Sequence, residues 1–154
     1  MKEVNIYIDA YHTGNLKKRT GTYSIVLEYM SEKKIPYTKQ YIEGIKRTTK
    51  HRTELLACID ALDHIVLPCD ITININSRYV TGAINDDTWI SWLNTGKNAK
   101  GQPAKNLDLW QQLFELADEY PVTFRYAAIN TYSLYMAGLM KKVEIEYKED
   151  AGNV

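Results

Sequence analysis

The first part of the chain alternates between apolar and polar residues. In VNIYIDA (residues 4–10), Val or Ile takes every second position, and Asp9 falls among the polar residues between them. This period of two is typical of a half-buried β-strand. TYSIVLEYM (22–30) and IPYTKQYIEG (35–44) show similar patterns, and their short connections predict an antiparallel meander of three strands. KKR (17–19), in the first connection, is expected to form an exposed charged turn.

A helical pattern follows the third strand. In RTELLACIDALDHIV (52–66), Leu and Ile recur at the spacing of one helix face, and either Thr49 or Thr53 would cap the helix N-terminus. The period returns to two in ITININ (71–76), where Ile alternates with polar residues. This stretch predicts a buried strand that ends on a polar residue, Asn76.

Further helices, a polar loop and a fifth strand complete the pattern. In order, they are SRYVTGAI (77–84), a short helix around Trp89 and Trp92, the loop GKNAKGQPAKN (96–106), the amphipathic helix LDLWQQLFELADEY (107–120) and the strand VTFRYAA (122–128). The rest, to about Lys148, has helical spacing, although VEIEY (143–147) also suits a strand. The order β-β-β-α-β-α-α-β-α predicts one α/β domain over residues 1–154, with a mixed sheet and helices on both faces.

Composition and charge narrow the functional classes. Lys plus Arg and Asp plus Glu number 19 each, so there is no strong global field for a polyanion, although a local basic patch remains possible. No run of eighteen apolar residues predicts a membrane span, and MKEVNIYID has no signal-peptide apolar region. Cys58 and Cys69 are too few for a zinc site or a disulfide framework. A reduced, cytoplasmic setting is expected.

Six short motifs, in the same order along the chain, resemble those of the type 1 ribonuclease H family. The motifs of the family read IYTDGS, TTNNRMELMA, YTDSQYV, KNxDLW, WVKGH and NERADxLA. Their counterparts here are IYIDAY (6–11), KRTTKHRTELLACIDAL (46–62), INSRYVTGAI (75–84), AKNLDLWQQL (104–113), FRYAAIN (124–130) and SLYMAGLM (133–140). The resemblance implies a ribonuclease H-like fold, with a five-stranded mixed sheet whose first three strands are antiparallel.

The resemblance also implies a chemistry. The family cleaves the RNA strand of an RNA–DNA hybrid with two Mg²⁺ ions held by four carboxylates. The first-strand Asp of the family matches Asp9, and the helix Glu matches Glu54. The third carboxylate falls on Asn76, the fourth on Ala137, and the His of the flexible loop falls at or near Asn130. Two of the four carboxylates are therefore kept.

Such a site is expected to be catalytically impaired. Because the chemistry relies on electrostatic stabilisation, losing half of the anions should cost several orders of magnitude in rate. Asp9 and Glu54 would hold at most one weakly bound Mg²⁺ or Mn²⁺, and no cofactor is required. Simpler roles stay open: a solvated strand-end carboxylate for Asp9, a helix-dipole contact for Glu54, a helix N-cap for Asn76 and packing for Ala137.

Two basic segments are candidates for binding nucleic acid. KRTTKHR (46–52) carries Lys50, His51 and Arg52 at a helix N-terminus, where they could attract phosphate; in the family, Lys50 and His51 would be a pair of Asn that touches both hybrid strands. The alternative is a solvated charged turn.

The second basic segment combines Trp with Lys. Trp89 and Trp92, with Lys97, Lys100 and Lys105, fall where many members of the family carry a basic handle for the DNA strand. Stacking aromatics and Lys suit single strands and hybrids. A core or hinge role for the two Trp residues is the alternative.

Three functional hypotheses remain open. The first is a degenerate ribonuclease H homologue that binds nucleic acid, as a hybrid or duplex, or a nucleic-acid-processing partner. The second is an active or weakly active metal-dependent endonuclease that cleaves the RNA strand of hybrids. The third is a non-catalytic protein–protein module or homo-oligomer, which twelve Tyr residues and a neutral charge would suit.

Overall fold

A computed structural model describes residues 2–14 and 19–153. Its strands are β1 (Lys2–Thr13), β2 (Thr20–Met30), β3 (Pro36–Lys46), β4 (Cys69–Ile75), β5 (Val122–Tyr126) and β6 (Tyr147–Glu149). Its helices are α1 (Lys50–Asp63), α2 (Arg78–Asn85), α3 (Thr88–Thr95), α4 (Leu107–Ala117) and α5 (Ser133–Met140). The charged turn expected at KKR (17–19) cannot be placed, because Lys17 and Lys18 lie outside the described residues.

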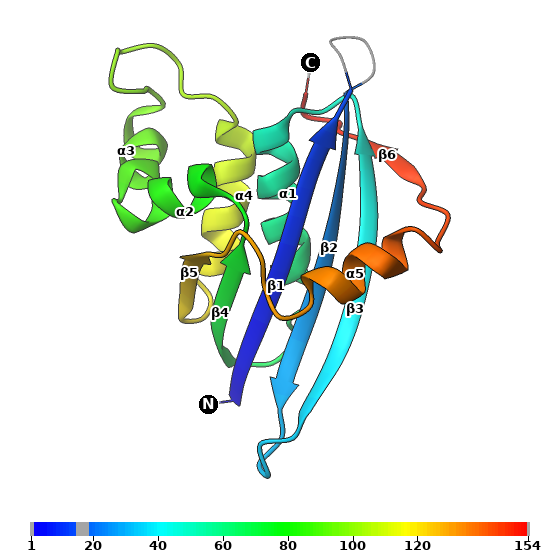
Figure 1. The fold of residues 1–154 in the computed structure, drawn as a ribbon. Coiled ribbons are helices and arrows are strands. Elements are labelled where there is room, and N and C mark those ends of the chain that lie inside the picture. The colour runs from blue at the N-terminus through cyan, green and yellow to red at the C-terminus, as the bar shows by residue number, and fades with distance from the viewer. Residues whose placement is uncertain (1, 15–18, 154) are drawn as a thin grey trace.

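The strands form one mixed sheet in the order β5-β4-β1-β2-β3-β6 (Figure 1). The first three strands are antiparallel, as the sequence predicts, and β4 and β5 add in parallel to the far side of β1. The sheet has six strands rather than the expected five. The extra strand, β6, pairs in parallel with only the last three residues of β3, so a short long-range contact creates it.

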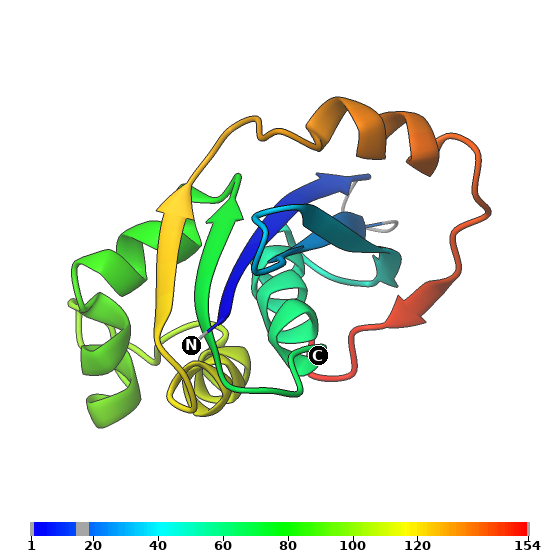
Figure 2. The same ribbon diagram turned by 90° about the horizontal axis from the view of Figure 1, so that it is seen from below.

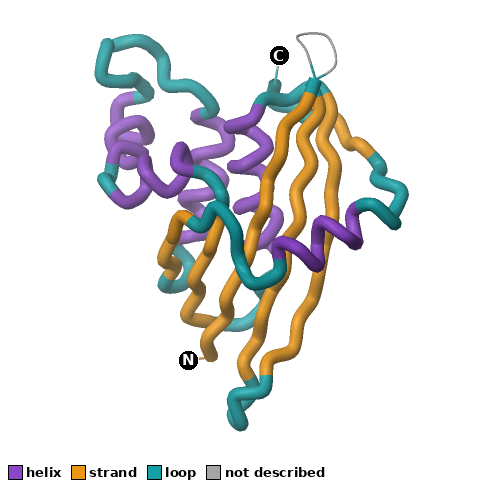
Figure 3. Tube along the Cα trace, viewed as in Figure 1, coloured by secondary structure: helices purple, strands orange, loops and turns teal. Residues whose placement is uncertain are grey.

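Helices cover both faces of the sheet, as predicted. α1 and α4 pack together on one face, and α5 crosses the opposite face (Figures 1 and 2). α2 and α3 lie at the β5 end of the sheet, beyond the layer that α1 and α4 form (Figure 3). Among the described residues, the helices are all too short or too polar to cross a membrane.

The core lies between the sheet and the α1–α4 layer. Apolar positions that alternate along β1 and β4 meet one face of α1 and the buried Trp110 of α4. Its largest fully buried members include Ile6, Ile8, Ile25, Leu27, Leu55, Ile71, Ile73, Ile75, Trp110 and Leu113. Both Cys residues are free and buried, as expected of packing residues.

Hydroxyl side chains cap two helices next to the sheet. Thr49 is the N-cap of α1, because its hydroxyl accepts from the Arg52 amide at 3.2 Å. Ser77 is the N-cap of α2, because its hydroxyl accepts from the Val80 amide at 3.1 Å. The cap role considered for Asn76 therefore belongs to its neighbour, which leaves the Asn76 side chain free for another contact.

Candidate active site

Asp9 lies on β1, one residue beyond the last residue that pairs with β4, and is 3% exposed. The Asn130 side-chain amide donates to Asp9 Oδ1 at 3.4 Å. Burial raises the pKa of Asp9 above its ordinary value, because the ionised form loses water, and a hydrogen bond from the Ser133 hydroxyl opposes this rise. The carboxyl group is thus held by neutral donors.

Asn76 follows β4, directly beside β1. The parallel register Ile8↔Ile75 brings its side chain to Ala10. The Ala10 amide donates to Asn76 Oδ1 at 2.9 Å, and Asn76 Nδ2 donates to the Ala10 carbonyl at 3.0 Å. The side chain thus extends the hydrogen bonding between β1 and β4 by one residue. An ionised carboxylate at this position could accept the first bond but not donate the second.

Glu54 is buried on α1, and both of its oxygens are engaged. The Ser77 hydroxyl donates to Oε1 at 2.9 Å, and Lys50 Nζ donates to Oε2 at 3.1 Å. Since Ser77 follows Asn76 in the chain, hydrogen bonds and peptide bonds connect Asp9, Asn76 and Glu54 in one group. The link from Glu54 to Asp9 thus runs through Ser77, Asn76 and the peptide group of Ala10.

The structure places residues other than Ala137, the fourth predicted site residue, next to Asp9. Ala137 is exposed, whereas Ser133, one helical turn earlier, contacts Asp9. A turn sets this arrangement: the Asn130 amide donates to the Ser133 hydroxyl at 2.9 Å, and Asn130 Oδ1 accepts from the Tyr132 amide at 2.7 Å. Asn130 and Ser133, rather than Ala137, complete the surroundings of Asp9.

A different alignment of the last family motif would have indicated that Asn130, rather than Ala137, lies near Asp9. Placing the Asn of NERADxLA on Asn130, three residues earlier, moves its Asp from Ala137 to Leu134. The same alignment puts its Leu on Met136, which is buried. Under either alignment the fourth carboxylate is missing.

The donor set does not fit a pair of Mg²⁺ ions. Such a centre needs several anionic oxygens in octahedral geometry. Asp9 and Glu54 supply the carboxylates, but Lys50 pairs with the second, and the Asn76 oxygen accepts from Ala10. In residues 2–14 and 19–153, no three His, Cys, Asp or Glu side chains gather closely enough to hold a metal ion. The group therefore offers too few anionic oxygens for such a centre.

The three basic residues at the start of α1 have different surroundings. Lys50 is exposed and pairs with Glu54. His51 stacks on Tyr79 with ring centroids 3.7 Å apart, and burial lowers the pKa of its imidazole. Arg52 is buried and donates to Asp108 and Asp150, at distances from 2.7 to 3.1 Å.

Arg52 is therefore a structural residue and is not available to a phosphate group. Its guanidinium joins the start of α1 to α4 and to the segment after β6. The pKa of Arg52 is raised, first by the hydrogen bonds to Asp108. The structure removes Arg52 from the candidate binding surface, because helix α1 turns it toward the interior.

The Trp and Lys residues of the second basic segment also lie in different surroundings. Trp89 is 8% exposed and packs against Trp110 and Phe114, so it belongs to the core. The second Trp, Trp92, lines a hollow of about 740 Å³ in the loop after α3. Lys97, Lys100 and Lys105 line the same hollow.

A smaller hollow joins the two basic segments. It has a volume of about 230 Å³ and lies where the N-termini of α1 and α4 meet. Its lining residues are Thr49, Lys50, His51, Lys105 and Asn106. Lys105 lines both hollows, so the surface from Lys50 to Lys100 is continuous.

The fold and the site define a class: an α/β protein whose mixed sheet carries acidic and amide side chains where the pairing of two adjacent parallel strands ends. The RNase H family model matches residues 1–130, and the chain belongs to this family. The matched region ends at the turn that precedes α5, so α5 and β6 lie beyond it.

Curated relatives and solved structures agree with this assignment. The chain is 35% identical to ribonuclease H of Lachnoclostridium phytofermentans, over 79% of this chain and 77% of the relative. It is 37% identical to ribonuclease H of Clostridium botulinum, over 80% of this chain and 81% of the relative.

Two solved structures share the fold at low identity. The crystal structure of LC9-RNase H1, a type 1 RNase H with the type 2 active-site motif, has a TM-score of 0.70 at 20% identity, over 88% of this chain and 70% of that one. The solution structure of the PFV RNase H domain has a TM-score of 0.67 at 20% identity, over 91% of each chain.

Proposed function

We propose that this chain binds an RNA–DNA hybrid or a related nucleic acid and cleaves it slowly or not at all. The observation that carries the proposal is the bond pair between Asn76 and Ala10. It places a neutral amide where the family has a metal-binding carboxylate, and it gives that amide a structural use. Family membership supports the nucleic-acid part of the proposal.

The charge of the site supports slow or absent cleavage. Two dications carry four positive charges, whereas Asp9 and Glu54 carry two negative charges, and Lys50 pairs with the second. Transition-state stabilisation in this chemistry is mainly electrostatic. We expect a rate lower than that of a complete site by about three orders of magnitude or more, the scale of losing essential catalytic groups.

The continuous basic surface supports binding. Lys50 and Lys105 lie at the N-termini of α1 and α4, where helix dipoles also favour phosphate. Lys97 and Lys100 extend the surface, and Trp92 offers an aromatic ring beside them. Because Lys50 also contacts Glu54, a strand bound here would pass next to the group that contains Asp9.

A second candidate function is weak metal-dependent cleavage of the RNA strand. It is favoured by the retention of both Asp9 and Glu54 and by the names of the curated relatives. In this case Asp9 and Glu54 would bind a single Mg²⁺ or Mn²⁺ ion, with Ser133 and Asn130 as neutral neighbours.

One pair of assays tests both candidates. A labelled RNA–DNA hybrid is incubated with the protein and Mg²⁺ or Mn²⁺, beside the Lachnoclostridium relative as the active standard. Cleavage that Asp9→Asn abolishes would support the second candidate, and a rate close to that of the standard would contradict the first. Binding is titrated at about 50 and 200 mM salt, where phosphate contacts predict a steep loss of affinity. Absence of binding at the lower salt contradicts the proposal, and an oligomer in size exclusion would then favour the protein-interaction module.

A further inference from the structure

The C-terminal segment, residues 147–153, folds back on the basic turn that leads into α1. β6 pairs with the last three residues of β3, which end at Lys46. Beyond β6, the Asn153 side-chain amide donates to the Arg47 carbonyl at 2.8 Å. The RNase H family match stops at residue 130, so this segment lies outside the matched region.

Glu149 in this segment pairs with two cations of the turn. Arg47 Nε donates to Glu149 Oε2 at 2.7 Å, and a second guanidinium nitrogen contacts Oε1. Lys46 Nζ lies 3.9 Å from the same carboxylate. All three side chains are at the surface, with 43–66% of their area exposed. An exposed ion pair of this kind is weak in water and can exchange partners.

Asp150, the next residue, anchors the segment in the interior. Its carboxylate accepts from the Thr48 hydroxyl at 2.8 Å and from Arg52 Nε at 2.7 Å. Both ionic partners are almost fully buried. The two neighbouring acids therefore differ: Asp150 fixes the backbone, and Glu149 holds surface cations.

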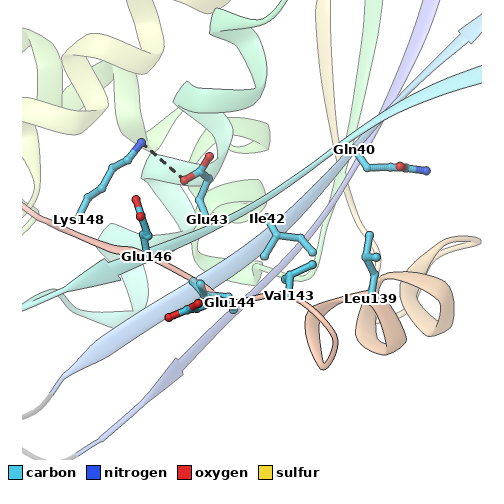
Figure 4. A pocket seen from close by; sticks show the side chains of 9 residues that line it. Gln40, Ile42, Glu43, Leu139, Val143, Glu144, Glu146 and Lys148 are labelled. Carbon is cyan, nitrogen blue, oxygen red and sulfur yellow. Dashed lines mark ion pairs between the residues drawn. The ribbon is translucent and has the colours of Figure 1, made fainter.

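A hollow separates the approach to β6 from β3 (Figure 4). It has a volume of about 520 Å³ and lies between Ile42 on one side and Val143–Glu146 on the other, with Leu139 of α5 at one end. Pairing with β3 begins only at Tyr147. The ladder, the Asp150 anchor and the bond from Asn153 to Arg47 hold the backbone of the segment. The exposed Glu149 side chain can leave its cations without release of that backbone.

We propose that Glu149 is an internal anion that competes with nucleic-acid phosphate for Arg47 and Lys46. Glu149 thereby lowers the affinity of the basic turn for polyanions, and displacement of its side chain from Arg47 raises that affinity. This inference rests on the proposed nucleic-acid function and describes the regulation of the same surface. Arg47 lies three residues before Lys50, so a phosphate bound by Arg47 would extend the surface around the N-terminus of α1.

The test compares Glu149→Gln with Glu146→Gln. Both variants remove one negative charge from the same stretch of chain, but Glu146 precedes the segment and lines the hollow rather than the basic turn. We expect Glu149→Gln to bind a labelled hybrid roughly threefold to tenfold more tightly at about 50 mM salt, with a salt slope steeper by about 0.9, the value of one added phosphate contact. Glu146→Gln should stay within about twofold of the unmodified protein, as a general charge effect. Adding Arg47→Ala to Glu149→Gln should remove the gain.

A heparin column separates failure of this inference from failure of the proposed function. If no variant binds the hybrid but Glu149→Gln elutes at higher salt than Glu146→Gln, the hybrid function is wrong and the masking of Arg47 stands. Equal gains by the two variants, in hybrid binding or in elution, would overturn the inference, because net charge alone would explain them. A gain that survives Arg47→Ala would overturn it as well.

Discussion

The side-chain amide of Asn76 makes both of its hydrogen bonds with the peptide group of Ala10. One bond uses its oxygen as acceptor and the other its nitrogen as donor, so the orientation of the amide is fixed by its partners. The pair continues the parallel ladder of β1 and β4 by one residue. At this position an amide is better suited than a carboxylate to hold two strands together, and less suited to bind a cation.

Asn76→Asp should therefore destabilise the fold without restoring cleavage. At neutral pH the introduced carboxylate would face the Ala10 carbonyl oxygen, so one bond is lost and two acceptors oppose each other. We expect the free energy of unfolding to fall by about 1–3 kcal/mol, the cost of an unsatisfied buried partner. Urea denaturation measures the change, and the hybrid-cleavage assay should stay at the level of the unmodified protein.

Measurements of unfolding at low pH provide the control for Asn76→Asp. A protonated carboxyl group can donate to the Ala10 carbonyl, so the deficit of Asn76→Asp should shrink as pH falls through the pKa of the new side chain. Asn76→Ala lacks this group and should show no such recovery. A variant Asn76→Asp as stable as the unmodified protein at neutral pH would contradict the structural role of the amide.

Asp9→Asn should stabilise the protein at neutral pH. Burial raises the pKa of Asp9 in the folded state, so folding favours the protonated form. Stability from this group is present below the pKa of the unfolded chain and is lost as pH rises through the folded pKa. Removing the charge should raise the thermal midpoint at neutral pH and leave it unchanged in acid. A lower midpoint at neutral pH would show that the Asp9 charge is balanced in the folded protein, for example by a bound cation.

The spacing of apolar residues along the sequence was sufficient to predict most of the fold. Strict alternation in residues 4–8 and 71–75 predicted the two central strands, because each buries one face against α1. β6 could not be predicted in the same way, since the strand considered at VEIEY (143–147) overlaps it only at Tyr147. Its three residues are exposed and carry no amphipathic signal, and its pairing depends on β3, about a hundred residues earlier in the chain.

The contacts of the candidate site could not be predicted from the sequence. Motif order identified Asp9, Glu54 and Asn76, whereas the bond from Asn76 to Ala10 follows only from the register of two parallel strands. Arg52 shows the limit most clearly. Its partners Asp108 and Asp150 are 56 and 98 residues away, so sequence context suggested an exposed cation where the fold has a buried ion pair.

Asp150→Asn should destabilise the fold more than Asp108→Asn. Both carboxylates accept from Arg52, but Asp150 is buried and Asp108 is 45% exposed on its side chain. Losing the buried partner leaves part of the Arg52 charge uncompensated, for which we expect about 3 kcal/mol, against less than about 1 kcal/mol for the exposed partner. Urea denaturation of the two variants measures the difference. Equal losses would contradict the anchor role of Asp150.

Acid should weaken the same cluster. Hydrogen bonds from Arg52 hold the pKa of Asp108 below its ordinary value of 3.8. A depressed folded pKa contributes stability above the pKa of the unfolded chain, and this contribution is lost as pH falls through the lower, folded pKa. Asp108→Asn should therefore lose its small deficit in acid, and the two denaturation curves should converge there. A deficit that grows in acid would contradict this assignment.

Lys105→Ala should weaken hybrid binding more than the loss of a lysine on the other face of the sheet. Lys105 lines both hollows of the basic surface, whereas Lys141 is exposed just after α5, which crosses the opposite face. If Lys105 contacts one phosphate, its removal should reduce the slope of log affinity against log salt by about 0.9 and act alike on hybrids of different sequence. Lys141→Ala removes the same charge and should leave the slope unchanged. Fluorescence anisotropy at several salt concentrations measures both, and equal slopes for the two variants would mean that nucleic acid binds elsewhere on the molecule.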